Sequence, residues 1–74
     1  MRLPVVKPDR VIRALCRAGF FIHHQRGSHC YLKHPDRPPP LVSVPRHNRD
    51  LKRKTLESII EQAGLTEEQF LALL

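Results

Sequence analysis

The chain has no tryptophan, one tyrosine and three phenylalanines in 74 residues, so leucine, isoleucine and valine must supply most of its core. A chain of this length is expected to form one domain, residues 1–74, and such a small domain is marginally stable. Neither of its two cysteines belongs to a CxxC pair, which argues against a disulfide scaffold. Reduced, buried thiols of a cytosolic protein are expected, with Cys16 on the apolar stripe of a helix.

Long apolar runs are also missing. No stretch approaches the roughly 20 residues needed to cross a bilayer, and residues 1–6 lack the apolar centre of a signal peptide. We therefore expect a cytoplasmic protein without a membrane segment.

Carboxylates are scarce where the basic residues gather. Residues 2–54 hold all 13 lysines and arginines but only three of the seven acidic residues, a net charge of +10. Residues 55–74 hold four glutamates and no base, a net charge of −4. This asymmetry indicates a polyanionic partner, although a solvated charged surface that binds nothing is the alternative.

Hydrophobic periodicity and the positions of proline and glycine predict the order of the elements. Gly19 and Gly64 stop the two longer helices, and Thr66 with Gln69 forms a capping box for a short last helix. The prolines of 34–40 exclude regular structure there. The sequence predicts a helix over 8–18, strands over 20–25, 28–33 and 41–44, and helices over 51–63 and 66–74.

This order predicts a two-layer α+β fold, in which a three-stranded antiparallel sheet carries two helices on one face. A short C-terminal helix completes it. Strand alternation places Cys30 and Leu32 toward the core, and His29, Tyr31 and Lys33 on the uncovered face. A bulge near the turn is the feature that could shift this assignment.

His29 is the candidate catalytic residue. Histidine is the side chain whose ordinary pKa suits proton transfer at neutral pH. On RNA, a base would take the proton of the ribose 2′-OH, that oxygen would attack the adjacent phosphate, and the 5′-oxygen would leave. Arg26, Lys33 and Arg46 are candidates to stabilise the charge that builds on the phosphate. The alternative is an ordinary surface histidine.

Other residues are candidates for binding rather than catalysis. His47 could contact phosphate together with the amides at the start of the second long helix, and Lys52 lies at the same place. Tyr31 could stack on a base, and Ser28 shapes the turn before His29. The alternatives are a loop histidine, an exposed basic turn and a half-buried strand tyrosine.

A metal centre is not expected, and neither is a cofactor. The spacing of the candidate ligands fits neither a zinc finger nor a zincin, and carboxylates for Mg²⁺ are few. Adjacent His23 and His24 on a strand should point to opposite faces. The candidate ligands are His23, His24, His29, His34 and Cys30.

Four blocks of the sequence, taken together, resemble the HicA toxins of bacterial and archaeal toxin–antitoxin systems. The first is Ala18-Gly19-Phe20, and the second is Arg26-Gly27-Ser28-His29 with His34-Pro35-Asp36. The third is Val44-Pro45-Arg46-His47, and the fourth runs over residues 52–65. Their order and spacing cover nearly the whole chain.

The resemblance implies a fold similar to double-stranded-RNA-binding domains and a metal-independent endoribonuclease that cuts mRNA and blocks translation. It assigns catalysis to His29 alone, and it implies a HicB-type antitoxin that covers the active site. The toxin alone is expected to be monomeric and to form a higher-order assembly with the antitoxin. The expected RNA-binding residues are Arg26, Ser28, Lys33, Arg46, His47 and Lys52.

The chain departs from the family pattern at three places. Cys30 stands where many members carry a second histidine, Lys54 replaces a small residue, and the turn over 36–40 is unusually rich in proline. Two alternatives to a toxin ribonuclease stay open. One is a non-catalytic RNA-binding module, and the other is an interaction domain that docks a protein on its acidic, apolar C-terminal helix.

Overall fold

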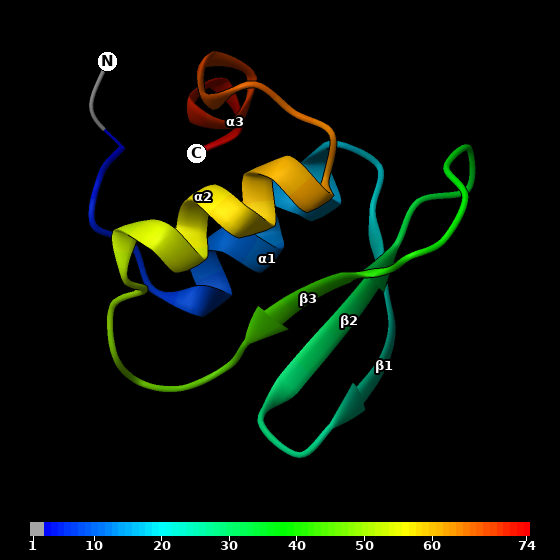
Figure 1. Cartoon of the computed structure of the whole chain (residues 1–74), viewed down its shortest axis with the longest axis horizontal. Helices are drawn as coiled ribbons and strands as arrows, with labels where there is room; N and C mark the ends of the chain where they lie inside the picture. The colour runs from blue at the N-terminus through cyan, green and yellow to red at the C-terminus, as the bar shows by residue number, and fades with distance from the viewer. Residues whose placement is uncertain (1–2) are drawn as a thin grey trace.

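A computed structural model describes residues 3–74 and has the predicted α+β order of helix, three strands, helix and helix. Each element begins and ends within about two residues of its expected position. The elements are α1 (Pro8–Arg17), β1 (Phe21–Arg26), β2 (His29–Lys33), β3 (Val42–Pro45), α2 (Arg53–Gln62) and α3 (Glu67–Leu73) (Figure 1).

The three strands form one antiparallel sheet in the order β1-β2-β3, with β2 in the centre. The turn between β1 and β2 lies at Gly27 and Ser28, and Gly27 has a positive φ of 59°. Arg26, which was expected in the turn, is the last residue of β1 and pairs with His29. On its other side His29 pairs with Pro45 of β3. A proline is tolerated there because it ends an edge strand.

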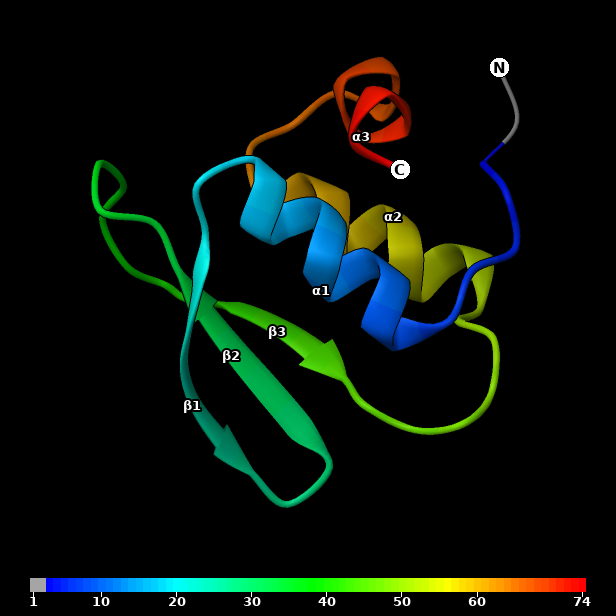
Figure 2. The same ribbon diagram turned by 180° about the vertical axis from the view of Figure 1, so that it is seen from behind.

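The core lies between the helices and one face of the sheet. Leu15 of α1, Leu32 of β2, Leu56 of α2 and Phe70 of α3 are among its largest fully buried side chains. Both long helices pack on β3, whereas all six residues of β1 are exposed. Figures 1 and 2 show the β1–β2 hairpin extending away from the helices. The helical layer therefore covers β2 and β3 and leaves β1 open.

Helix α3 covers the end of the core that lies away from the β1–β2 hairpin (Figure 1). The Thr66 side chain accepts a hydrogen bond from the Gln69 amide at 3.0 Å, and the Gln69 side chain accepts one from the Thr66 amide at 2.9 Å. The expected capping box is therefore present. The Arg17 guanidinium at the end of α1 donates to the Leu73 carbonyl at 2.6 Å. Phe70 is completely buried, so the main apolar residue of α3 packs on this chain's own core.

The expectation that Cys16 is buried is wrong. Val11, Ile12, Ala14 and Leu15 form the buried face of α1, and Cys16 is exposed. Each helical residue turns by about 100°, so Cys16 lies about 140° from Val11 around the axis. That angle places it beyond the edge of the buried face.

Candidate functional site

The face of the sheet that the helices leave uncovered, called the open face below, carries His29. Pairing residues point to the same side of a sheet, so His29 shares the open face with Arg26 of β1. Alternation along β2 adds Tyr31 and Lys33 to this face, while Cys30 and Leu32 are fully buried on the other. The predicted distribution of these side chains is therefore confirmed.

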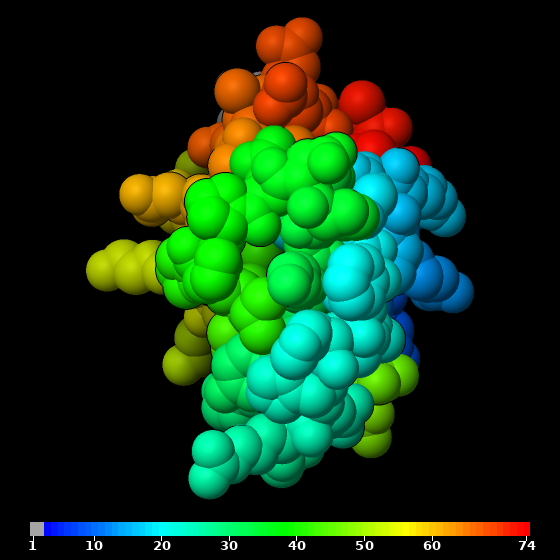
Figure 3. All heavy atoms as spheres, turned by 90° about the vertical axis from the view of Figure 1, so that its right-hand side faces the viewer, coloured from blue at the N-terminus to red at the C-terminus, as the bar shows by residue number. Residues whose placement is uncertain are grey.

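Tyr31 has two histidine neighbours on the open face. The ring of His24, its partner on β1, stacks on Tyr31 with centroids 4.6 Å apart and planes 16° apart. The ring of His29, two residues earlier on β2, lies tilted to Tyr31 with centroids 6.4 Å apart. Figure 3 views the molecule from the β1 side, where the hairpin forms an exposed surface beneath the proline-rich loop. Tyr31 is half-buried, as the alternative from the sequence had it, although an aromatic ring on a sheet can still stack on a nucleobase with its uncovered part.

The expectation that His23 and His24 point to opposite faces is wrong. The pairing of β1 with β2 shifts between Ile22 and His24, so His23 is an extra residue in the strand. Such a bulge interrupts the alternation of side chains. The two Nδ1 atoms consequently lie 2.8 Å apart, and the rings meet edge to face with centroids 5.1 Å apart.

Arg46 lies at the same end of the sheet as His29, but its side chain is bound on the helical side. Its Nε donates to Asp9 of α1 at 3.0 Å, and its Nη1 donates to Gln25 at 3.1 Å. Its backbone amide donates to the Ser28 carbonyl at 2.6 Å. Arg46 thus ties the hairpin to α1, and Ser28 contributes to this tie through its carbonyl.

His47 and Lys52 lie beyond the open face, at the start of α2. Together with Pro45 they line a hollow in the surface. Lys52 is the N-cap of α2, and the helix has neither a side-chain cap nor an acidic residue in its first turn. Its first amides are therefore free to meet an anion. Pro45 pairs with His29 and also lines this hollow, so it connects the two groups of predicted residues.

His34 makes structural contacts that the sequence did not predict. Its Nδ1 accepts the amide of Asp36 at 3.1 Å, so its Nε2 carries the proton that the Ala18 carbonyl accepts at 3.2 Å. The ring also meets Phe20 edge to face at 5.0 Å. A Cβ added at Gly19, where φ is +99°, would lie 2.8 Å from His34 Nε2. The Ala-Gly-Phe and His-Pro-Asp blocks are therefore the two sides of one contact.

Cys30 has no access to the open face. Burial raises the pKa of its thiol, and the positive charge of Arg46 opposes this only in part. A neutral buried thiol is a poor nucleophile and a poor metal ligand. Among residues 3–74, no three histidine, cysteine, aspartate or glutamate side chains gather closely enough to hold a metal ion.

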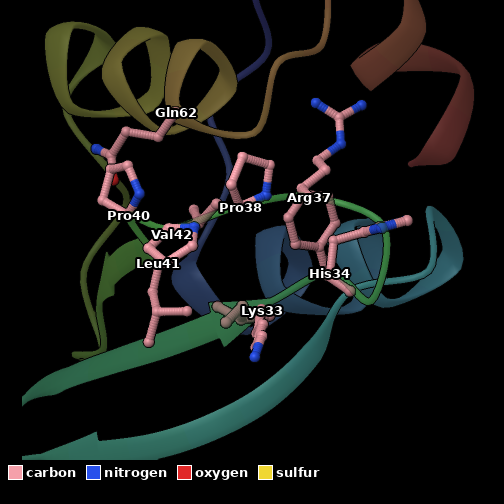
Figure 4. Close-up of a pocket in the computed structure, with 11 residues that line it drawn as sticks. Lys33, His34, Arg37, Pro38, Pro40, Leu41, Val42 and Gln62 are labelled. Atoms are coloured by element: carbon pink, nitrogen blue, oxygen red, sulfur yellow. The ribbon is translucent and has the colours of Figure 1, made fainter.

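A separate pocket of about 280 Å³ lies between the proline-rich loop and the end of α2, and it does not include His29 (Figure 4). Arg37, Pro40 and Gln62 are among the residues that line it. Only Lys33 belongs both to this pocket and to the predicted binding residues. The other predicted site residues lie on or beside the open face or at the start of α2, so the open face is the stronger candidate site.

Residues 8–65 match the family model described as the HicA toxin of bacterial toxin–antitoxin systems. The chain belongs to the HicA toxin family. The match confirms the resemblance of the four sequence blocks to this family. Because the family consists of toxins from toxin–antitoxin systems, the general class of partner for this HicA toxin is an antitoxin. No curated protein matches the sequence. The matched segment spans α1 through α2 and includes His29, whereas α3 lies beyond it. No helix within residues 3–74 is both long and apolar enough to span a bilayer.

Proposed function

We propose that this HicA toxin is a metal-independent endoribonuclease that cleaves mRNA in the cytoplasm and so blocks translation. The observation that carries the proposal is the position of His29. It is exposed at the start of the central strand, with Arg26 beside it on the open face. A histidine that shares a sheet face with an arginine combines a side chain suited to proton transfer with the positive surroundings that RNA transesterification requires.

In this mechanism His29 is the general base. A ring nitrogen takes the proton from a ribose 2′-OH, and the 2′-oxygen attacks the adjacent phosphorus. The bond from phosphorus to the 5′-oxygen breaks, which leaves a 2′,3′-cyclic phosphate and a 5′-hydroxyl. Arg26 and Lys33, which share the open face with His29, stabilise the negative charge on the phosphate.

The RNA would run from the open face, past Pro45, to the start of α2. His47, Lys52 and the free amides of α2 would bind phosphates at that end. Arg46 lies between the two regions, and its contacts with Asp9 and Ser28 hold the turn in place. A HicB-type antitoxin would neutralise the toxin by covering the open face of a monomeric toxin within a larger complex.

The experiment compares purified wild-type protein with His29→Ala on a long RNA, in the presence of a chelator. A general base contributes about 10²- to 10⁴-fold, so we expect His29→Ala to cleave at least a hundredfold more slowly. The exposed position of His29 predicts an unchanged circular dichroism spectrum. Glu61→Ala, an exposed change on α2, is the control and should cleave at the wild-type rate.

Undiminished cleavage by His29→Ala would contradict the assignment of His29 as the general base. A requirement for Mg²⁺ would exclude the metal-free mechanism. Salt-sensitive RNA binding without cleavage by the wild-type protein would instead favour the non-catalytic RNA-binding module.

A further inference from the structure

Transesterification needs an acid as well as a base, because the 5′-oxygen must receive a proton as it leaves. His29 as the base leaves this acid unassigned. The other titratable or charged side chains of β1 and β2 on or beside the open face are His23, His24, Arg26, Tyr31 and Lys33. Among them the histidines have the ordinary pKa best suited to giving up a proton at neutral pH.

His24 lies where such an acid is needed. It pairs with Tyr31, and His29 stands two residues before Tyr31 on β2. His24 and His29 are therefore diagonal neighbours on one face, and such neighbours have Cα atoms roughly 7–8 Å apart. Both rings neighbour Tyr31, His24 across the strands at 4.6 Å and His29 along β2 at 6.4 Å between ring centroids. A phosphodiester above Tyr31 would have its attacking oxygen near one ring and its leaving oxygen near the other.

The bulge in β1 supplies His24 with a hydrogen-bond partner. At 2.8 Å between the two Nδ1 atoms, one ring must donate and the other must accept. When His24 donates, it can carry protons on both nitrogens while His23 stays neutral, and a bond from a charged donor is the stronger kind. The stacking on Tyr31 and the bond to His23 then fix the ring, with Nε2 left for a ligand.

We propose that His24 is a second catalytic residue, the general acid for the leaving 5′-oxygen, and that His23 is its positioning residue. The assignment rests on the proposed ribonuclease function. His29 gains the proton of the 2′-OH as the new bond from the 2′-oxygen to phosphorus forms. His24 Nε2–H gives its proton to the 5′-oxygen as the old bond from phosphorus breaks, so the total number of protons is unchanged.

The test uses two short RNAs that differ at one atom, with sulfur in place of the leaving 5′-oxygen in the second. A thiolate leaves without a proton, since a thiol is far more acidic than an alcohol. We expect His24→Ala to cleave the ordinary RNA about a hundredfold more slowly and to regain most of the wild-type rate on the sulfur RNA. His29→Ala should stay slow on both substrates, because the sulfur does not replace the base.

His24→Gln, which keeps the size of the side chain, and Ile22→Ala, an exposed change on the same strand, complete the set. His24→Gln should repeat the result of His24→Ala, and Ile22→Ala should cleave both RNAs like wild type. His23→Ala should lower the rate on ordinary RNA. His23→Asn should restore much of it, because the side-chain oxygen of the asparagine can accept the hydrogen bond from His24.

An equal loss on both RNAs, or no loss on the ordinary RNA, would overturn the assignment of His24 and leave His29 as the base. Failure of the wild-type protein to cleave either RNA would overturn the ribonuclease function itself, and the assignment of His24 with it.

Discussion

At the scale of single residues, neighbouring positions in β2 have opposite environments. His29 is exposed, whereas Cys30 is fully buried. A residue at position 30 therefore faces the core and does not share the open face with His29. A cysteine suits this place because it behaves as a small apolar side chain. An imidazole there would need a buried hydrogen-bond partner. The departure from the family pattern at Cys30 thus leaves the open face intact.

The two thiols are expected to react at very different rates. Cys16 is exposed, whereas Cys30 is buried and its raised pKa leaves less thiolate at any given pH. A chromogenic disulfide reagent at neutral pH should label one thiol rapidly in the native protein and two in urea. Cys16→Ser should abolish the rapid phase, and Cys30→Ser should retain it. Two rapid thiols in the native wild-type protein would contradict the burial of Cys30.

At the scale of elements, α3 belongs to the core although it lies outside the matched segment. The family match ends at residue 65, and α3 runs over Glu67–Leu73. Its capping box fixes where it starts, and Phe70 fills the end of the core with no exposed surface. β1 is the opposite case, because it lies inside the matched segment and is exposed along its whole length. Membership of the core and membership of the matched segment are therefore separate properties.

Phe70→Ala should destabilise the protein strongly. Truncating a buried phenylalanine typically costs about 3–5 kcal/mol of unfolding free energy, and a small domain has only about 5–15 kcal/mol in total. Urea unfolding followed by circular dichroism measures the change. Glu68→Ala, an exposed change on the same helix, should alter the stability by less than about 0.5 kcal/mol. A loss below about 1 kcal/mol for Phe70→Ala would mean that α3 is not integral to the core.

At the scale of the whole molecule, the basic residues of the hairpin and the acidic residues of α3 lie in different parts of the fold. The hairpin with Arg26 and Lys33 lies at one end, and α3 with Glu67 and Glu68 lies at the other (Figures 1 and 2). The glutamates of α3 are therefore distant from the turn of the hairpin, where Arg26 and His29 lie. Such a separation orients the protein as it approaches a polyanion.

If the proposed RNA path is correct, binding should depend steeply on salt. The three cationic side chains along the proposed path that pair with no carboxylate in the described part of the chain, Arg26, Lys33 and Lys52, predict a slope of about −2.1 for single-stranded RNA in a plot of log affinity against log salt. Raising the salt from about 50 to about 200 mM should then weaken binding about eighteenfold. His29→Ala, which binds without cutting, is the protein for this titration, and Lys33→Ala should reduce the slope by about 0.7. A slope near zero would contradict a phosphate-binding surface.

The sequence by itself determined the order of the elements and the distribution of side chains along β2. Apolar spacing, glycine stops and the capping residue Thr66 act within a few residues of the chain, and so they can be predicted locally. The alternation that exposes His29 and buries Cys30 is equally local. Membership of the HicA family was also visible, because its motifs are short blocks in a fixed order.

The tertiary structure alone decided which side chains meet. The bulge that turns His23 toward His24 depends on how β1 pairs with β2, and the contact of His34 with Ala18 joins residues that are 16 positions apart. Arg46 was expected to act on phosphate, but it is bound to Asp9, 37 positions away. Such contacts depend on the register of the sheet and on how the helices pack across it. Neither is encoded in the spacing of neighbouring residues, so the surroundings of the candidate site emerged only from the fold.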